Sequence, residues 1–373
     1  MKELQVILAS QKRILNSGER AALATVVDVK GSSYRLPGAK MLIAETGETF
    51  GTVSGGCLEA DVLERAKRVL KTGEPEVFTY DTTKTDDSVF ALNMGCRGIV
   101  RILLEPIDRE SFLLRVLEIA FNNRERQVIA TLISAIGVPD LPIGSRVFYD
   151  QVEQFHFKNI TDDFGFRDEL LKDCELFFNK DGISHCKIYE TEIGNFEFFF
   201  EIIKPAPYLL IFGAGADAIP LAEFAKNLGW YVSVVDHRPA FATKERFPLV
   251  DEIKISRPEN LKLPCEDNLV AVMMTHNYEH DKQILRLLLK SDAHYVGVLG
   301  PKKRTENILL EIRQTGEAFS EKDWQKLYAP VGLDIGADTP ETIALSIIAE
   351  IQSVLARRGG GFLRNRQGSI YNR

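Results

Sequence analysis

Two short segments in the first half of the chain join glycines to a cysteine, a pattern suited to binding an anion or a metal. The first is Ser54-Gly55-Gly56-Cys57, which directly precedes an amphipathic stretch that predicts a helix. Glycines let backbone N–H groups converge on an anion, and a helix N-terminus lowers the pKa of a neighbouring thiol. Because thiolates suit soft metals, we interpret Cys57 as a candidate reactive thiol and metal ligand.

The second segment, NMGCRG at positions 93–98, places Cys96 between Gly95 and Arg97, just before a predicted strand. Cys96 is therefore a second candidate thiol and metal ligand, although without a helix dipole to favour its thiolate. The alternative for each cysteine is a small packing residue in a tight turn, and the residues alone leave both interpretations open. We expect Cys57 to be the functional thiol. The remaining cysteines lie outside glycine-rich turns and predict packing or surface residues: Cys174, Cys186 and Cys265.

A third segment, GSSYRLPGAK at positions 31–40, combines two glycines with two hydroxyls and two cations. Such groups recognise phosphate, since charged donors make the stronger hydrogen bonds to it. The candidate cofactor-binding residues of this segment are Ser32, Ser33, Arg35 and Lys40.

The second half contains a dinucleotide-binding fingerprint, with Gly213, Gly215 and Ala218 placed between a predicted strand and a helix. The glycines allow a tight turn and close approach of a pyrophosphate to the backbone. Asp236 ends the next strand, where a carboxylate binds ribose hydroxyls and favours NAD; Arg238 beside it leaves the choice between NAD and NADP open. We expect NAD or a related nucleotide. The alternative is a Rossmann domain whose nucleotide site is vestigial or takes another nucleotide.

His276 follows an apolar strand and is expected at the carboxyl edge of the sheet, where open α/β sheets bind ligands. It is a candidate acid/base or ligand contact, and a structural role is the alternative. His280 is four residues further on, but Asn277 and Asp281 resemble turn and N-cap residues. The two histidines are therefore not expected to share a helical face, and we expect no metal here.

Continuous apolar strands alternate with helices after residue 207, which predicts a doubly wound α/β domain. The expected strands are 208–212, 231–235, 252–255, 268–274 and 295–299, and the expected helices are 218–228, 281–289, 304–314 and 341–355. The first half predicts strands at 21–29, 40–44, 48–53, 100–104 and 196–203, with a helix at 58–70 that ends at Gly73.

The sequence thus predicts a mixed α+β N-terminal domain followed by a Rossmann-like doubly wound C-terminal domain. The proline pair in KPAP, 204–207, indicates the boundary, giving domains 1–204 and 207–373. Residues 110–204 either belong to the first domain or form a subdomain of it.

The composition is that of a soluble globular protein: 373 residues, 45% hydrophobic and 27% charged. A net charge of −7 argues against a general nucleic-acid binder, and no apolar run approaches the length of a membrane span. The N-terminus predicts an amphipathic helix rather than a signal peptide. Five cysteines, an odd number without a CxxC pair, indicate a reducing compartment, so we expect a cytoplasmic protein. We also expect a homodimer.

The chain resembles the XdhC/CoxI family through GSSYRLPGAKMLI, FGTVSGGCLEADVLERA, NMGCRGIVRILLEP, the fingerprint segment and GLDIGADTPETIALS. The resemblance implies an accessory protein that binds molybdenum cofactor, supports its sulfuration by a cysteine desulfurase, and hands it to an apo molybdenum hydroxylase such as xanthine dehydrogenase. It also implies a cofactor-insertion chaperone rather than a turnover enzyme. Cys57 and Cys96 fall on the family's cysteine positions. The second motif departs from the family, because Arg97 stands where a glycine is usual.

Two alternatives come from other functional classes. One is an NAD-dependent oxidoreductase with His276 as its acid/base; the other is a regulatory NAD-binding module that oligomerises. Both account for the Rossmann half, but they leave the two cysteine segments without a role.

Overall fold

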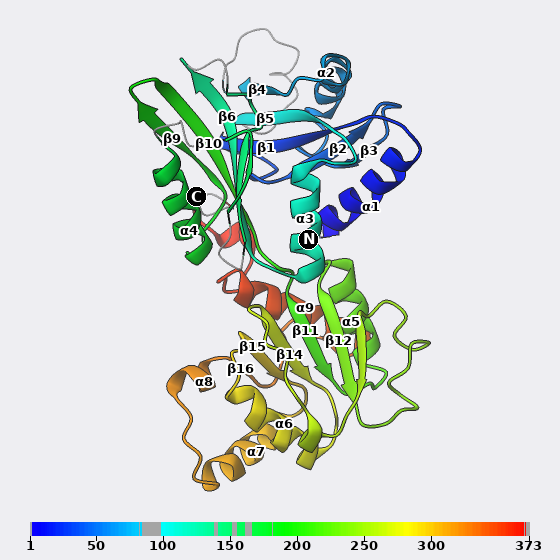
Figure 1. The fold of residues 1–373 in the computed structure, drawn as a ribbon. Helices are drawn as coiled ribbons and strands as arrows, with labels where there is room; N and C mark the ends of the chain where they lie inside the picture. Colours follow the sequence, from blue (N-terminus) through cyan, green and yellow to red (C-terminus); the bar gives the residue numbers. More distant parts are fainter. Residues whose placement is uncertain are drawn as a thin grey trace. The chain divides into compact units, whose positions relative to one another are not determined.

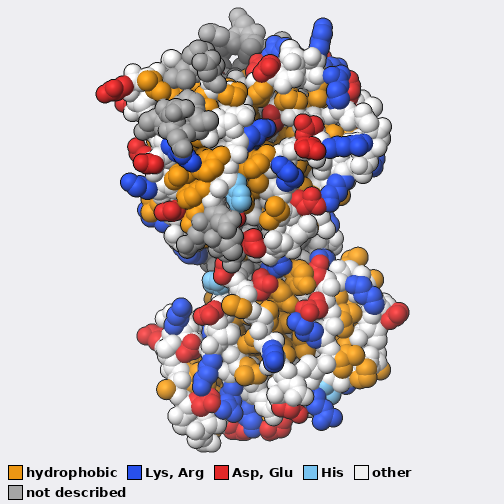
Figure 2. Space-filling model, in the orientation of Figure 1, with side chains coloured by type: hydrophobic (Ala, Val, Ile, Leu, Met, Phe, Trp, Pro, Cys, Tyr) orange, Lys and Arg blue, Asp and Glu red, His pale blue; other side chains and the backbone are white. Residues whose placement is uncertain are grey.

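The structure, a computed structural model, describes residues 2–81, 83, 98–137, 141–150, 155–160, 166–180, 182–368 and 370. By their contacts the residues divide into two units, Glu3–Pro205 and a second unit that holds the rest of the chain (Figure 1). Among the described residues, no helix combines the length and the apolarity needed to cross a membrane. Acidic and basic side chains are intermixed on the face shown in Figure 2.

The first sheet of the N-terminal unit is antiparallel, in the order β3-β2-β1-β5-β4. Its strands are β1 (Ala21–Gly31), β2 (Lys40–Ala44), β3 (Thr49–Gly51), β4 (Glu76–Asp81) and β5 (Gly98–Ile107). Alternate residues of β1 face opposite sides, as the period of a strand requires. Ala22 and Ala24 pack under α2 (Glu59–Thr72), whereas Ala21 and Leu23 pack with α1 (Lys2–Asn16) and α3 (Phe112–Asn123).

The second sheet is also antiparallel, in the order β8-β7-β6-β10-β9. Its strands are β6 (Gln127–Ile136), β7 (Arg146–Tyr149), β8 (Phe155–Lys158), β9 (His185–Thr191) and β10 (Gly194–Ile203). Helix α4 (Arg167–Asn179) covers one face over a core rich in phenylalanine. A small apolar cluster joins this sheet to the first one: Val27 and Leu103 pack with Ile133 and Phe199.

The second unit is built on a parallel sheet in the order β13-β12-β11-β14-β15-β16. Its strands are β11 (Tyr208–Phe212), β12 (Tyr231–Asp236), β13 (Glu252–Ile255), β14 (Leu269–Met273), β15 (Tyr295–Val298) and β16 (Leu327–Tyr328). Counted from β11, this is the 3-2-1-4-5-6 order of the Rossmann fold. Helices α5 (Ala218–Asn227) and α9 (Pro340–Leu355) cover one face, and α6 (Tyr278–Leu289) and α7 (Lys302–Gln314) cover the other. A short helix, α8 (Glu321–Gln325), precedes β16.

The predicted fold class is confirmed, and the departures from the expected elements are local. Gly73 ends α2 in a left-handed conformation, φ 77°, as its position predicted. Strand β5 continues through Pro106 because β4 already begins opposite Leu104, so from there β5 has a neighbour on one side only. Helix α6 begins three residues before the predicted start, because the Asn277 side chain caps it by accepting from the His280 N–H.

Candidate functional site

The topology of the first sheet brings two of the predicted cofactor-binding segments, those of Cys57 and of GSSYRLPGAK, to one edge. Strands β1, β3 and β4 run toward this edge, and β2 and β5 run away from it, since neighbours in the sheet are antiparallel. The β1–β2 and β3–α2 connections therefore lie there, beside the end of β4 and the beginning of β5, and we call it the loop edge. Cys96, Gly95 and Arg97 belong to the β4–β5 connection but lie outside the described residues.

Cys57 lies on the β3–α2 connection, exposed, one residue before Leu58, the N-cap of α2. Gly55 and Gly56 precede it with φ angles of +89° and +119°, conformations that favour glycine. The glycine turn thus presents the Cys57 thiol to solvent at the N-terminus of a helix.

The N–H groups of this turn already bind a carboxylate, that of Glu59 in the first turn of α2. Glu59 accepts from five backbone N–H groups at 2.8–3.3 Å, those of Val53, Ser54, Gly55, Gly56 and Leu58. The hydroxyls of Thr52 and Ser54 also donate to it. Burial raises the pKa of Glu59, but these donors outweigh burial and lower the pKa to about 2. The anion nest predicted from the glycines therefore holds an anion of the protein itself.

The β1–β2 connection packs directly against this turn. A Cβ added to Gly55 would lie 2.6 Å from the ring of Tyr34, so the ring covers the glycine closely. Arg35 forms an ion pair with Glu3, which also accepts from the Thr52 N–H. The structure thus brings the Cys57 turn and the GSSYRLPGAK segment together, as neighbouring parts of one surface.

The four predicted residues of that segment differ in exposure. Ser32 is exposed, Ser33 is buried at 9%, and the Arg35 side chain is 26% exposed. The Lys40 side chain is only 4% exposed, and its ammonium is paired with Glu201 of β10. Lys40 therefore lies between the two sheets, and we do not include it in the proposed binding surface.

The remaining described cysteines lie elsewhere. Cys174 lies on the buried face of α4, and burial raises the pKa of its thiol. Burial also raises the pKa of Cys186, to about 12, and its thiol donates to the Val27 carbonyl. Cys265 is exposed in the second unit. Among the described residues, no cluster of three histidine, cysteine or acidic side chains is arranged to hold a metal ion.

The glycine fingerprint of the second unit adopts the expected turn. Gly213 has φ +106°, and a Cβ there would meet the Met274 carbonyl oxygen at 2.4 Å, so only glycine fits. Ala218 begins α5. Above Gly215, however, a Cβ would meet Asp217 Oδ1 at 2.5 Å. The Asp217 carboxylate thus lies directly beside the second glycine.

Asp217 is held by His276, whose Nε2 lies 3.0 Å from its Oδ2. His276 has φ +55°, an uncommon conformation for a residue other than glycine, and its side chain is 67% exposed. It precedes α6, so it does not share a helical face with His280. An exposed His–Asp pair at the carboxyl edge could transfer a proton.

The carboxylate of Asp236, the predicted ribose ligand, already accepts hydrogen bonds from several groups of the protein. Its side chain is 2% exposed and accepts from the Ala214 N–H at 2.7 Å and from the N–H and guanidinium of Arg238. Burial raises the pKa of Asp236, but these donors lower it to about 2. Asp236 therefore fastens the glycine turn to the end of β12.

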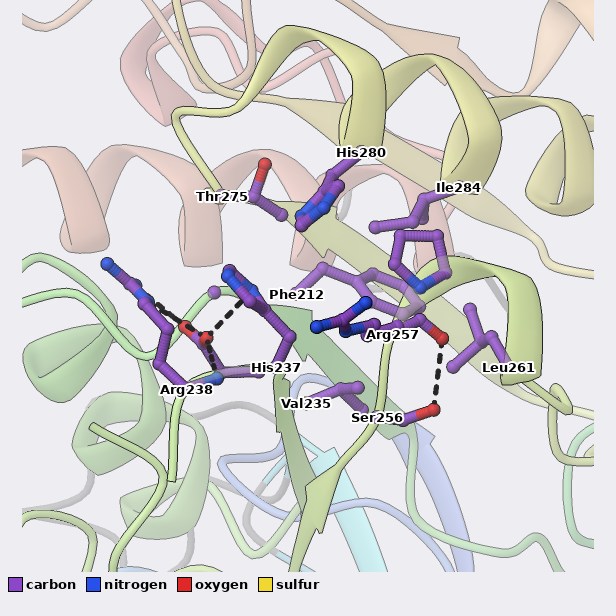
Figure 3. A pocket seen from close by; sticks show the side chains of 13 residues that line it. Phe212, Val235, His237, Arg238, Ser256, Arg257, Leu261, Thr275, His280 and Ile284 are labelled. Carbon is purple, nitrogen blue, oxygen red and sulfur yellow. Dashed lines mark hydrogen bonds and ion pairs between the residues drawn. The ribbon is translucent and has the colours of Figure 1, made fainter. Parts of the chain in front are cut away.

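A small pocket of about 20 Å³ lies beside Asp236, at the carboxyl ends of β11, β12, β13 and β14 (Figure 3). We call it the edge pocket. Its lining includes apolar side chains and four nitrogen-bearing ones, those of His237, Arg238, Arg257 and His280. The rings of His237 and His280 meet edge to face at 4.6 Å.

Sequence reasoning missed Glu59 and Arg257. Glu59 belongs to the FGTVSGGCLEADVLERA segment. An acidic residue in the first turn of a helix, shortly after two glycines, indicates a carboxylate that accepts from the N–H groups of the glycine turn. Arg257 follows a weakly predicted strand, and its place at the pocket depends on β13 joining the parallel sheet next to β12.

Comparisons with known proteins agree with this architecture. Residues 14–81 match the XdhC and CoxI family, and residues 209–351 match the XdhC Rossmann domain. A Bacillus subtilis protein, named as a probable xanthine dehydrogenase subunit, is 33% identical over 341 residues, which cover 91% of this chain and 94% of that protein. The Escherichia coli molybdenum cofactor insertion chaperone PaoD is 24% identical, with 94% of this chain and 88% of PaoD covered.

A solved structure is similar as well. The crystal structure of a protein named a xanthine dehydrogenase from Bacillus halodurans has a TM-score of 0.74 and 29% identity, covering 95% of this chain and 98% of that one. The length and identity of these matches place the present chain within a single family over both units. The chain belongs to the XdhC and CoxI family and has an XdhC Rossmann domain as its C-terminal half.

Proposed function

We propose that this protein binds molybdenum cofactor as cargo and delivers it to a xanthine dehydrogenase-like molybdenum hydroxylase. The observation that carries the proposal is the exposed Cys57 thiol, placed by a glycine turn at the N-terminus of α2. The relationship to a molybdenum cofactor insertion chaperone and to a probable xanthine dehydrogenase subunit supports it.

The residues of the loop edge offer such a cargo a thiol ligand, but the N–H groups of the Cys57 turn are not available for its anionic part. A thiol gives up its proton to become a soft ligand, which suits molybdenum. The N–H groups of the turn are bound to Glu59, so the anionic part of the cargo would contact other donors, such as the exposed Ser32. Cys96 is proposed as a second ligand from its sequence alone.

The proposal includes the partners and the setting that this role requires. An apo hydroxylase receives the cofactor, and a cysteine desulfurase supplies sulfur to the cofactor. The protein acts in the cytoplasm, as a homodimer, and as an insertion chaperone rather than a turnover enzyme. NAD-dependent oxidoreduction has less support, because it would leave the Cys57 turn without a role.

The test compares Cys57→Ser with Cys265→Ser, since Cys265 is the other exposed cysteine of the described residues. Each variant is purified after co-expression with the cofactor pathway, and its bound molybdenum, bound pterin and activation of an apo-hydroxylase are measured. Cys57→Ser should retain cofactor about tenfold less well, a loss of about 1.4 kcal/mol of binding free energy, because a hydroxyl is a poor soft-metal ligand. Cys265→Ser should match the wild type.

Circular dichroism of both variants separates loss of cofactor from loss of fold. Full cofactor retention and full activation by a folded Cys57→Ser would refute the proposed role. Unfolding of Cys57→Ser would instead show that Cys57 is a packing residue of the turn.

A further inference from the structure

One aromatic ring lies flat on the backbone of the Cys57 turn. A Cβ added to Gly55 would lie 2.6 Å from Cδ1 of Tyr34 and 2.9 Å from each of the neighbouring ring atoms, Cγ and Cε1. A point in the plane of the ring, outside Cδ1, would lie much farther from these two neighbours than from Cδ1. The nearly equal distances therefore place Gly55 over one face of the Tyr34 ring.

The opposite side of this ring faces outward. Tyr34 is 63% exposed, although Gly55 covers one of its two faces. The exposed area therefore belongs mainly to the other face and to the edge of the ring. Aromatic rings prefer an offset-stacked arrangement with a second flat ring. A ring that is supported on one face by backbone and exposed on the other is thus a platform on which a flat ligand can stack.

The support under the ring is held in place by several hydrogen bonds. The Gly55 N–H donates to Thr52 Oγ1 at 3.0 Å and to the Glu59 carboxylate at 3.2 Å. On the other side of the contact, the neighbour of Tyr34 in the chain, Arg35, is paired with Glu3. The position of the ring is therefore fixed before any ligand binds, which reduces the entropy that binding would cost.

The ring and the Cys57 thiol lie close enough to contact one small molecule. Cys57 is two residues beyond Gly55, and two residues of chain span at most about 7 Å. Both Tyr34 and Cys57 are exposed. In molybdenum cofactor, the dithiolene that holds the metal is joined through a pyran ring to a flat pterin. A cargo whose metal end lies at Cys57 therefore has its pterin within reach of Tyr34.

We propose that the exposed face of Tyr34 stacks on the pterin of the cargo while Cys57 contacts its metal end. This inference rests on the function proposed above and adds to it the residue that recognises the organic part of the cargo. Stacking on a ring face uses no backbone donor. It is therefore compatible with a turn whose N–H groups are already bound to Glu59.

Two substitutions separate the ring of Tyr34 from its hydroxyl. Tyr34→Leu keeps an apolar side chain beside Gly55 but removes the ring, whereas Tyr34→Phe keeps the ring. After co-expression of the full chain with the cofactor pathway, Tyr34→Leu should retain bound molybdenum and pterin about tenfold less well than the wild type, and Tyr34→Phe should restore retention. The matched control is Phe362→Leu, since Phe362 is an aromatic residue of the second unit that is 71% exposed. It should retain cofactor as the wild type does.

A fluorescent variant reports the stacking directly. The two tryptophans of the chain, Trp230 and Trp324, lie in the second unit, so Tyr34→Trp adds an indole at the platform of the N-terminal unit. A pterin stacked on an indole quenches its fluorescence. The emission that Tyr34→Trp adds to that of the wild type should be present in cofactor-free protein and strongly quenched in cofactor-loaded protein.

The outcomes distinguish this inference from the function on which it rests. Wild-type protein that holds neither molybdenum nor pterin would overturn both. Equal retention by the wild type and Tyr34→Leu, equal loss in Tyr34→Leu and Tyr34→Phe, or unquenched emission from loaded Tyr34→Trp would overturn the stacking alone and leave the role of Cys57 in place. If circular dichroism shows that Tyr34→Leu does not fold, the quenching in Tyr34→Trp decides the question.

Discussion

Glu59 shows that a glycine-rich turn can be organised around a carboxylate of its own chain. Seven donors of the β3–α2 connection surround this side chain. We infer that Glu59 is a positioning residue, which holds the turn so that Cys57 faces solvent.

Replacing Glu59 tests this inference through stability. Glu59→Gln removes the charge and replaces one acceptor by a donor, so it should lower the free energy of unfolding by about 1–3 kcal/mol at pH 7. The folded pKa of about 2 lies below the ordinary value of 4.5, so the stabilisation is present above pH 4.5 and is lost as the pH falls toward 2. Urea unfolding at pH 7 and pH 3 should show the wild-type advantage shrinking at pH 3.

Glu64→Gln is the control for this change, because Glu64 lies on the same helix and its side chain is 66% exposed. It should lie within about 0.5 kcal/mol of the wild type at both pH values. A Glu59→Gln deficit that is the same at pH 7 and pH 3 would rule out the pH-dependent contribution.

At the scale of elements, the loop edge depends on how closely β5 begins beside the β1–β2 connection. A Cβ at Gly98 would lie 2.3 Å from the Ser32 carbonyl oxygen and 2.8 Å from that of Lys30. Both contacts are with backbone, which cannot move aside as a flexible side chain can. Gly98 therefore allows β5 to begin next to the GSSYRLPGAK segment.

Gly98→Ala should accordingly destabilise the N-terminal unit by about 1–3 kcal/mol, the usual cost of overpacking. Gly361→Ala is the matched control, since nothing lies within 4 Å of a Cβ there. Thermal unfolding followed by circular dichroism measures both variants. Equal midpoints for Gly98→Ala and the wild type would mean that the connection relaxes freely.

At the scale of the whole N-terminal unit, buried and half-buried ion pairs link the two sheets. Arg146 of β7 pairs with Glu105 of β5, with side chains 2% and 8% exposed. Lys40 of β2 pairs with Glu201 of β10, and Arg101 of β5 pairs with Glu197 of β10. These contacts, with the apolar cluster around Phe199, explain why Glu3–Pro205 forms one unit by its contacts.

Breaking one such pair should be costly, because it leaves a buried charge without its partner. Glu105→Gln should lower the free energy of unfolding by about 3–5 kcal/mol. Glu48→Gln removes the partner of Arg13 in an exposed pair, 62% and 50% exposed, and should cost at most about 1 kcal/mol. Urea unfolding of the two variants makes the comparison, and similar losses in both would contradict the special role of the buried pair.

The sequence by itself determined the second unit almost completely. The strand at Tyr208–Phe212 has the predicted limits, and most of the other strands and helices differ from prediction by one to three residues. Continuous apolar strands bounded by turns are local signals, and their alternation with helices predicts a doubly wound sheet, whereas the short α8 and β16 were not predicted. The sequence also indicated Cys57 and the glycine fingerprint, because glycines next to reactive side chains can be recognised without knowledge of the tertiary contacts.

Only the tertiary structure decided which partners these residues have. Lys40 and Asp236 were predicted to face ligands, yet one is paired with Glu201, 161 positions away, and the other with Arg238 and the Ala214 N–H. The same holds for Glu59 in the nest and for Asp217 beside Gly215. Which opposite charge a side chain contacts depends on its position in space, and the pairing of the strands sets that position. Residue spacing predicts where a polar group stands in an element, but not which group neutralises it.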